Sequence, residues 1–101
     1  MKTEIWVVTH KKYKEIDDDL HKTIQVGKSL GTDLGYVGDD TGDNISYKNP
    51  FYCELTGMYW LWKNYKCDII GICHYRRFFL ENTELITKDY IENILKDYDI
   101  I

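Results

Sequence analysis

The sequence predicts an α/β domain built on a Rossmann-like parallel sheet. Residues 5–8 (Ile-Trp-Val-Val) and residues 68–73 (Asp-Ile-Ile-Gly-Ile-Cys) carry nearly unbroken apolar runs. Such runs are typical of strands buried on both faces, as in parallel sheets, whereas half-exposed strands alternate. A helical pattern separates the two runs and another follows them, and this βαβ order predicts parallel strands joined by right-handed crossovers.

Between the first strand and the central helix, the chain is mostly polar. Residues 14–20 are charged and predict a turn or a short helix, and residues 23–26 predict a second short strand that Gly27 ends. Residues 31–48 are rich in Gly, Asp, Asn and Ser, a composition that predicts a loop. Loops of this length inside compact domains are usually functional or disordered.

The clearest helix begins at Asn49-Pro50. The Asn49 side chain can cap the first turn, and Pro50 stands where a missing N–H costs nothing. The spacing predicts one buried apolar face. Its members are Phe51, Tyr52, Leu55, Met58, Tyr59 and Trp62, while Trp60, Leu61 and Tyr65 extend the apolar surface to a second side.

The C-terminal part predicts a further helix and the start of another strand. Thr87 can cap a helix that carries apolar residues up to Tyr98. Residues 99–101 (Asp-Ile-Ile) then read as strand. Because a domain rarely finishes on the opening residues of a buried strand, we expect the sequence to be part of a longer protein.

Composition narrows the class of protein. With 101 residues the chain forms one small domain, and its net charge of −4 disfavours a nucleic-acid partner. Cys53, Cys67 and Cys73 are odd in number and lack a CxxC spacing, which favours free thiols in a reducing cytosol. With no signal peptide and no apolar run long enough to span a membrane, the sequence predicts a cytoplasmic protein.

Polar residues follow two of the predicted strands, at the edge where α/β sheets bind ligands. His74, Tyr75, Arg76 and Arg77 come directly after one strand, and Thr9, His10 and Lys11 end another. Two adjacent guanidinium groups can bind a pyrophosphate. Surface arginines bridging nearby acids, and strand-end residues that only cap a turn, are the alternatives.

Acidic residues offer two further candidates. Asp39, Asp40 and Asp43 cluster in the predicted loop and could hold Mn²⁺ or Mg²⁺, although the same residues also make ordinary turns and do not match an EF-hand. Glu54 is a candidate catalytic residue, yet the helix dipole alone would explain an acid near this N-terminus. No phosphate-binding glycine loop, dinucleotide GxGxxG or nucleophile elbow is present in the sequence.

Several blocks, in order, resemble a known family. They are VVTHK, QVG, DTGDNIS, YCELTG, GICHYRRFF and YDII. The sequence resembles a bacterial family long catalogued as a domain of unknown function and found in capsular and exopolysaccharide gene clusters. Some of its members are assigned as galactosyl- or galactofuranosyltransferases, and members are typically more than twice as long.

The resemblance implies a truncated glycosyltransferase A-type fold, with residues 1–101 forming the N-terminal, nucleotide-sugar-binding portion. It implies a UDP-sugar donor, a lipid-linked or oligosaccharide acceptor, and a role in capsule, exopolysaccharide or O-antigen synthesis. Peripheral contact with the inner face of the membrane, through a part beyond these residues, and homo-oligomer formation are further expectations. The residues expected at the donor are Thr9, His10, Lys11, Asn44, His74, Tyr75, Arg76 and Arg77.

The sequence departs from the wider fold because no Asp-x-Asp follows the later strand, and we expect the arginines to take part of the metal's task. Two other interpretations stay open: a non-catalytic nucleotide- or sugar-binding module, and a small α/β domain whose arginines serve subunit contacts.

Overall fold

The computed structural model describes residues 2–81 and 83–98, and its centre is a sheet of four parallel strands in the order β3-β2-β1-β4. The strands are β1 (Thr3–Thr9), β2 (His21–Gln25), β3 (Val37–Gly38) and β4 (Ile69–His74). In the register, Val7 of β1 lies between Thr23 of β2 and Cys73 of β4. The predicted Rossmann-like α/β architecture is therefore confirmed.

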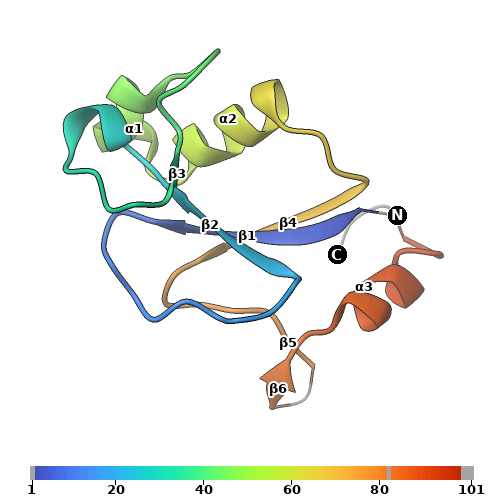
Figure 1. Cartoon of the computed structure of the whole chain (residues 1–101). Coiled ribbons are helices and arrows are strands. Elements are labelled where there is room, and N and C mark those ends of the chain that lie inside the picture. The colour runs from blue at the N-terminus through green and yellow to red at the C-terminus, as the bar shows by residue number, and fades with distance from the viewer. Residues whose placement is uncertain (1, 82, 99–101) are drawn as a thin grey trace.

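Helices cover both faces of this sheet. Helix α2 (Leu55–Asn64) packs on one face and α3 (Lys88–Ile94) on the other, as Figure 1 shows. Alternate residues of β1 point to opposite faces, so that Trp6 packs in the cluster under α2 and Ile5 in the cluster beside α3. This two-sided burial explains why β1 is apolar along its whole central run.

The connections are mostly irregular. They contain the 3₁₀ turns η1 (Lys28–Leu30) and η2 (Ser46–Lys48), the single-turn helix α1 (Asn49–Tyr52), and a small hairpin of β5 (Leu80–Glu81) and β6 (Glu84–Leu85). Residues 14–20 form an irregular loop with no helix, and the polar stretch 31–48 contains only β3 and η2. The strand predicted at 99–101 lies outside the described residues.

The helix predicted from Asn49 is broken in two. Between α1 and α2, Cys53 adopts the left-handed φ of 52°, and Asn49 is the first residue of α1 rather than its cap. The Asn49 amide instead donates to the Cys53 carbonyl (2.7 Å) and to Thr56 Oγ1 (3.0 Å). The prediction of one continuous helix capped by Asn49 is therefore wrong, because the Asn49 side chain bonds to Cys53 and Thr56 instead of capping the first turn.

The buried face of α2 also differs from the predicted one. The residues that face the sheet are Thr56, Gly57, Trp60 and Leu61. Of the predicted face, Phe51, Tyr52, Leu55, Met58 and Trp62 are exposed. Gly57 is the physical reason: a Cβ at this position would lie 2.7 Å from Val26 Cγ1, so only glycine lets the helix approach the sheet this closely.

The second half of the domain follows the sequence more closely. Thr87 caps α3 as predicted, since its Oγ1 accepts from the Tyr90 N–H at 3.2 Å. Strand β4 is half-buried rather than covered on both faces, with Ile70 43% exposed, because it is the last strand of the sheet in the described residues.

No helix in the described part of the chain has the length and apolar character needed to cross a membrane.

The face assignment can be tested with the same substitution at two positions of α2. Leu61 is 2% exposed and Leu55 is 52% exposed. We expect Leu61→Ala to lower the free energy of unfolding by about 2–5 kcal/mol and Leu55→Ala to change it by less than about 1 kcal/mol. Urea unfolding followed by circular dichroism measures both. Equal losses at the two positions would show that the assigned face is wrong.

Candidate functional site

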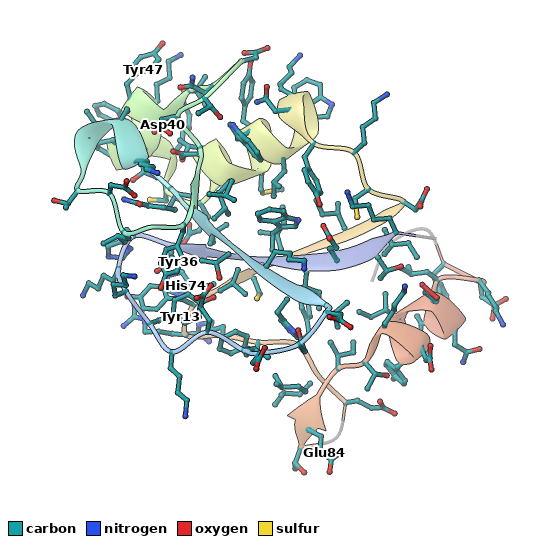
Figure 2. The ribbon with its side chains drawn as sticks, viewed as in Figure 1. Tyr13, Tyr36, Asp40, Tyr47, His74 and Glu84 are labelled. Carbon is teal, nitrogen blue, oxygen red and sulfur yellow. The ribbon has the colours of Figure 1, made fainter. Side chains whose placement is uncertain are left out.

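Strands β1, β2 and β4 end at one edge of the sheet, and their last residues are neighbours. The ladder continues past the strand ends, where the Val26 N–H donates to the Thr9 carbonyl (2.9 Å) and the Tyr75 N–H to the Val8 carbonyl (3.1 Å). Tyr75, the residue after His74 (labelled in Figure 2), has its ring 6.2 Å from that of Tyr13, which lies 6.0 Å from the ring of Tyr36. The two polar segments singled out in the sequence are thereby brought together.

Two adjoining pockets open at this edge. The β2-side pocket, of about 570 Å³, is lined by His10, Lys11, Lys12, Gln25, Val26, Gly27, Leu30, Gly31, Thr32, Leu34, Asn49 and Pro50. The β4-side pocket, of about 270 Å³, is lined by Val8, Thr9, His10, Val26, Asn49, Pro50, Cys53, Glu54 and His74. Because four residues line both, one elongated ligand can occupy the two pockets together.

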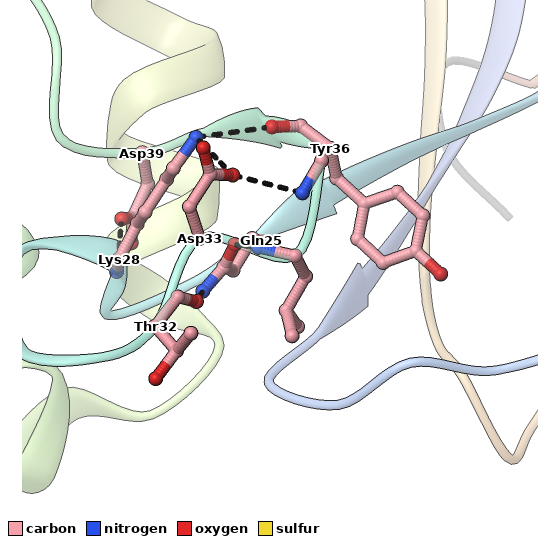
Figure 3. Close-up of polar contacts among 8 residues, drawn as sticks. Gln25, Lys28, Thr32, Asp33, Tyr36 and Asp39 are labelled. Atoms are coloured by element: carbon pink, nitrogen blue, oxygen red, sulfur yellow. Dashed lines mark hydrogen bonds and ion pairs between the residues drawn. The ribbon is translucent and has the colours of Figure 1, made fainter.

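Gln25 fixes the wall of the β2-side pocket formed by residues 32–34. Its buried amide donates to the Thr32 carbonyl (2.7 Å) and accepts from the Leu34 N–H (3.1 Å). Lys28 holds the same loop from the other side, since its Nζ lies 3.2 Å from Asp33 Oδ1 (Figure 3). The hydrogen bond from the Gly35 N–H, and then Lys28, lower the pKa of Asp33. Residues 32–34 are therefore held in place as one wall of the pocket, although their sequence predicts only an irregular loop.

The segment after β1 presents cationic side chains to the pocket. His10 and Lys11 are exposed and line it, as does Lys12. Thr9 has a different role, because its buried Oγ1 donates to the Lys11 carbonyl (2.6 Å) and accepts from the Lys11 N–H (3.0 Å). Thr9 thus shapes the turn that carries Lys11.

His74 and Glu54 face each other across the β4-side pocket. The Arg76 N–H donates to His74 Nδ1 at 3.2 Å, so in this arrangement Nδ1 is the acceptor and the ring proton is on Nε2. That Nε2 lies 3.7 Å from Glu54 Oε1, and the Glu54 side chain is 49% exposed. The pocket therefore contains a carboxylate that is accessible to a ligand and close to an oriented imidazole.

The turn after β4 carries two exposed arginines. Tyr75 packs between the segments, with its ring 5.6 Å from that of His10, and the Arg76 guanidinium lies 5.3 Å from the Tyr75 ring centre. Within residues 2–81 and 83–98, neither Arg76 nor Arg77 forms an ion pair. They do not line either pocket, but only Tyr75 separates them in sequence from His74, which lines the β4-side pocket.

The three aspartates that are candidate metal ligands do not share one environment. Asp39 is fully buried, and its carboxylate accepts four hydrogen bonds from the protein. Asp43 is exposed and accepts from the Tyr59 hydroxyl at 2.8 Å, which raises the pKa of Tyr59. In the described residues no three His, Cys, Asp or Glu side chains are grouped as metal ligands. The Asp39 carboxylate is therefore engaged by the protein itself, and a Mn²⁺ or Mg²⁺ site at Asp39, Asp40 and Asp43 stays a prediction.

Asn44 is also outside the two pockets. Its amide nitrogen donates to the Gly42 carbonyl (3.0 Å) and its oxygen accepts from the Ser46 N–H (3.2 Å), so it orders its own loop.

Sequence reasoning missed several lining residues. Gln25 is the last residue of β2 and Gly27 comes just after it, as Thr9 ends β1 and His74 ends β4, so the same rule applied to β2 would have found them. Nothing in the local sequence indicates that Asn49, Pro50 and Cys53 bend back over the strand ends, because that depends on the break between α1 and α2.

The fold and the site together define an α/β domain of the Rossmann-like class with an open, partly cationic cleft at its strand ends. Residues 4–101 match the family described as a domain of unknown function, DUF4422, and the chain belongs to that family. A solved structure, the apo form of the bifunctional glycosyltransferase WbbM, is similar to this chain, with 35% sequence identity and a TM-score of 0.71. The similarity covers 91% of this chain and 19% of that chain. A comparison with curated protein sequences gave no match.

These comparisons support a glycosyltransferase-like family long catalogued as a domain of unknown function, as the resemblance implied.

The cysteines offer a test of the pocket that needs no ligand. Cys53 is exposed and lines the β4-side pocket, whereas burial raises the pKa of the Cys73 thiol to about 11. At about pH 8 only about one Cys73 in a thousand is a thiolate, the reactive form. We expect iodoacetamide to label Cys53 well before Cys73 in the folded protein, as mass spectrometry of digests would measure. Cys53→Ser provides the control, and labelling of Cys73 at the same rate as Cys53 would contradict the assigned burial.

Proposed function

We propose that this chain is the nucleotide-sugar-binding part of a glycosyltransferase. The observation that carries the proposal is the pair of adjoining pockets at the strand ends, which join an apolar wall to a group of cationic side chains. The similarity to a bifunctional glycosyltransferase supports the same reaction class. The donor is a nucleoside diphosphate sugar, which has an apolar base, a dianionic linker and a polar sugar in one elongated molecule.

Each part of such a donor has a matching region. Val26, Leu30 and Leu34 give the β2-side pocket the apolar surface that suits a nucleobase. His10 and Lys11 extend over the same opening and suit the diphosphate. The sugar then occupies the β4-side pocket, beside Glu54 and His74.

The charges of the site suit a reaction in which negative charge develops on the departing diphosphate. Arg76 and Arg77 stabilise that charge, because guanidinium groups bind phosphate oxygens bidentately and remain charged at all physiological pH values. Glu54 is the candidate catalytic or sugar-positioning acid, since its carboxylate is accessible in the β4-side pocket. No step is assigned to a metal ion.

The finer parts of the proposal come from the family resemblance. They are a UDP donor, galactose or galactofuranose as the transferred sugar, a lipid-linked or oligosaccharide acceptor, and a role in capsular, exopolysaccharide or O-antigen synthesis on the cytoplasmic side of the membrane.

Calorimetric titration with UDP-galactose and with UDP, with and without Mn²⁺, tests the proposal. We expect saturable binding of both ligands. Replacing Arg76 and Arg77 together by Ala should weaken it at least roughly 10- to 100-fold, which corresponds to the loss of one charged hydrogen bond of about 1.5–3 kcal/mol. Lys96→Ala is the matched control, because Lys96 is an exposed cation after α3, far in sequence from the pockets.

Absence of binding, or equal affinity in the double variant and the Lys96 control, would overturn the donor-site assignment. Donor binding without turnover by the longest natural form of the protein would favour the alternative, a non-catalytic nucleotide- or sugar-binding module.

A further inference from the structure

The buried Asp39 carboxylate lies behind the pocket walls rather than in the pockets. Its Oδ2 accepts from the Gly27 N–H (2.8 Å) and the Thr56 hydroxyl (2.7 Å). Its Oδ1 accepts from the Lys28 N–H (3.1 Å) and the Ser46 hydroxyl (2.6 Å). One side chain therefore joins the turn after β2, the η2 turn and the first turn of α2.

The network reaches the opposite wall of the pockets through Asn49. The Asn49 amide donates to Thr56 Oγ1, the same oxygen that donates to Asp39, and also to the Cys53 carbonyl. Cys53 and Glu54 line the β4-side pocket, and Gly27 lines the β2-side pocket. The chain of hydrogen bonds Asp39–Thr56–Asn49 thus connects both walls.

The two walls are also in direct contact. A Cβ built on Gly27 would lie 2.6 Å from Asn49 Oδ1, and Gly27 has a left-handed φ of 66°. Any displacement of the turn after β2 relative to the α1–α2 break would therefore change the width of the cleft.

We propose that Asp39 is a positioning residue, an internal anion that sets the spacing of the two walls of the donor cleft. The inference rests on the proposed function for the identity of the ligand, whereas the hydrogen bonds of Asp39 do not depend on that function. A carboxylate offers four acceptor positions on two oxygens, and here all four receive a donor. The isosteric amide of Asn would turn its NH₂ group toward one backbone N–H and one hydroxyl. The hydroxyl can rotate to accept, but the N–H loses its acceptor and faces another donor, so at least one hydrogen bond is replaced by repulsion.

Asp39→Asn and Thr56→Val test this role from both ends of the network. Both substitutions should weaken binding of UDP-galactose about tenfold or more. Each removes a charged hydrogen bond that holds a wall of the cleft, and the displaced wall no longer fits the donor. Thr56→Ser keeps the hydroxyl, and its affinity should stay within about threefold of the wild type. All titrations are made below the onset of unfolding of each variant.

Leu61→Ala distinguishes positioning from general destabilisation. Leu61 belongs to the core under α2 and is not one of the four residues that donate to Asp39. We expect Leu61→Ala to lower the melting temperature while the folded protein binds the donor as the wild type does. If Thr56→Val binds normally when folded, or if Leu61→Ala weakens binding as much as Thr56→Val does, the positioning role is wrong.

Hydrogen exchange at the Gly27 and Lys28 amides separates this inference from the proposed function. Faster exchange at these two amides in Asp39→Asn and Thr56→Val, but not in Thr56→Ser, is the expected result. If the wild type binds no UDP-sugar, the proposed function fails, and the exchange rates still decide the role of Asp39. Unchanged exchange in Asp39→Asn would overturn the inference even where the donor binds.

Discussion

The carboxylate of Asp39 joins three segments that are distant in the sequence: the turn at Gly27, the η2 turn at Ser46 and the first turn of α2 at Thr56. A buried carboxylate is costly unless it is fully hydrogen-bonded, so the folded state requires all of these donors in place at once. Two of the donors are backbone N–H groups at the left-handed Gly27, an arrangement that favours anions. The loop from 31 to 48 is thereby tied to the sheet even though it contains little regular structure.

The shape of the cleft depends on this interaction. Thr56 also accepts from Asn49, whose amide at the same time holds the Cys53 carbonyl. The helix is then interrupted at Cys53, where the backbone takes a conformation that costs about 1–3 kcal/mol for a non-glycine residue. The break directs Cys53 and Glu54 toward the ends of β1 and β4, where a straight helix would have carried them away. Structural hydrogen bonds therefore help to place the Glu54 carboxylate at the β4-side pocket.

The parallel sheet supplies the other half of the site. Parallel strands direct their carboxyl ends to one edge, so His10, Gln25 and His74 become neighbours although they are far apart in sequence. Tyr75 packs against His10 and beside Arg76, which links the turn after β4 to the segment after β1. Lys11 and Lys12 line one pocket in a chain whose net charge is −4. The proposed diphosphate site rests on this local concentration of positive charge rather than on the overall composition.

The sequence by itself determined the parallel sheet, the capped helix α3 and the edge at which the two pockets open, because apolar runs, a capping threonine and strand-end polar residues act locally. It also identified His10, Lys11, Glu54 and His74 as candidates, and all four line the pockets. Only the tertiary structure decided the helix break at Cys53, the face that α2 buries and the role of Asp39. Each of these depends on contacts between residues distant in the sequence. The need for glycine at position 57 arises because Val26 lies opposite. The Asp39 carboxylate, one of three candidate metal ligands in the sequence, is occupied by donors from three separate segments.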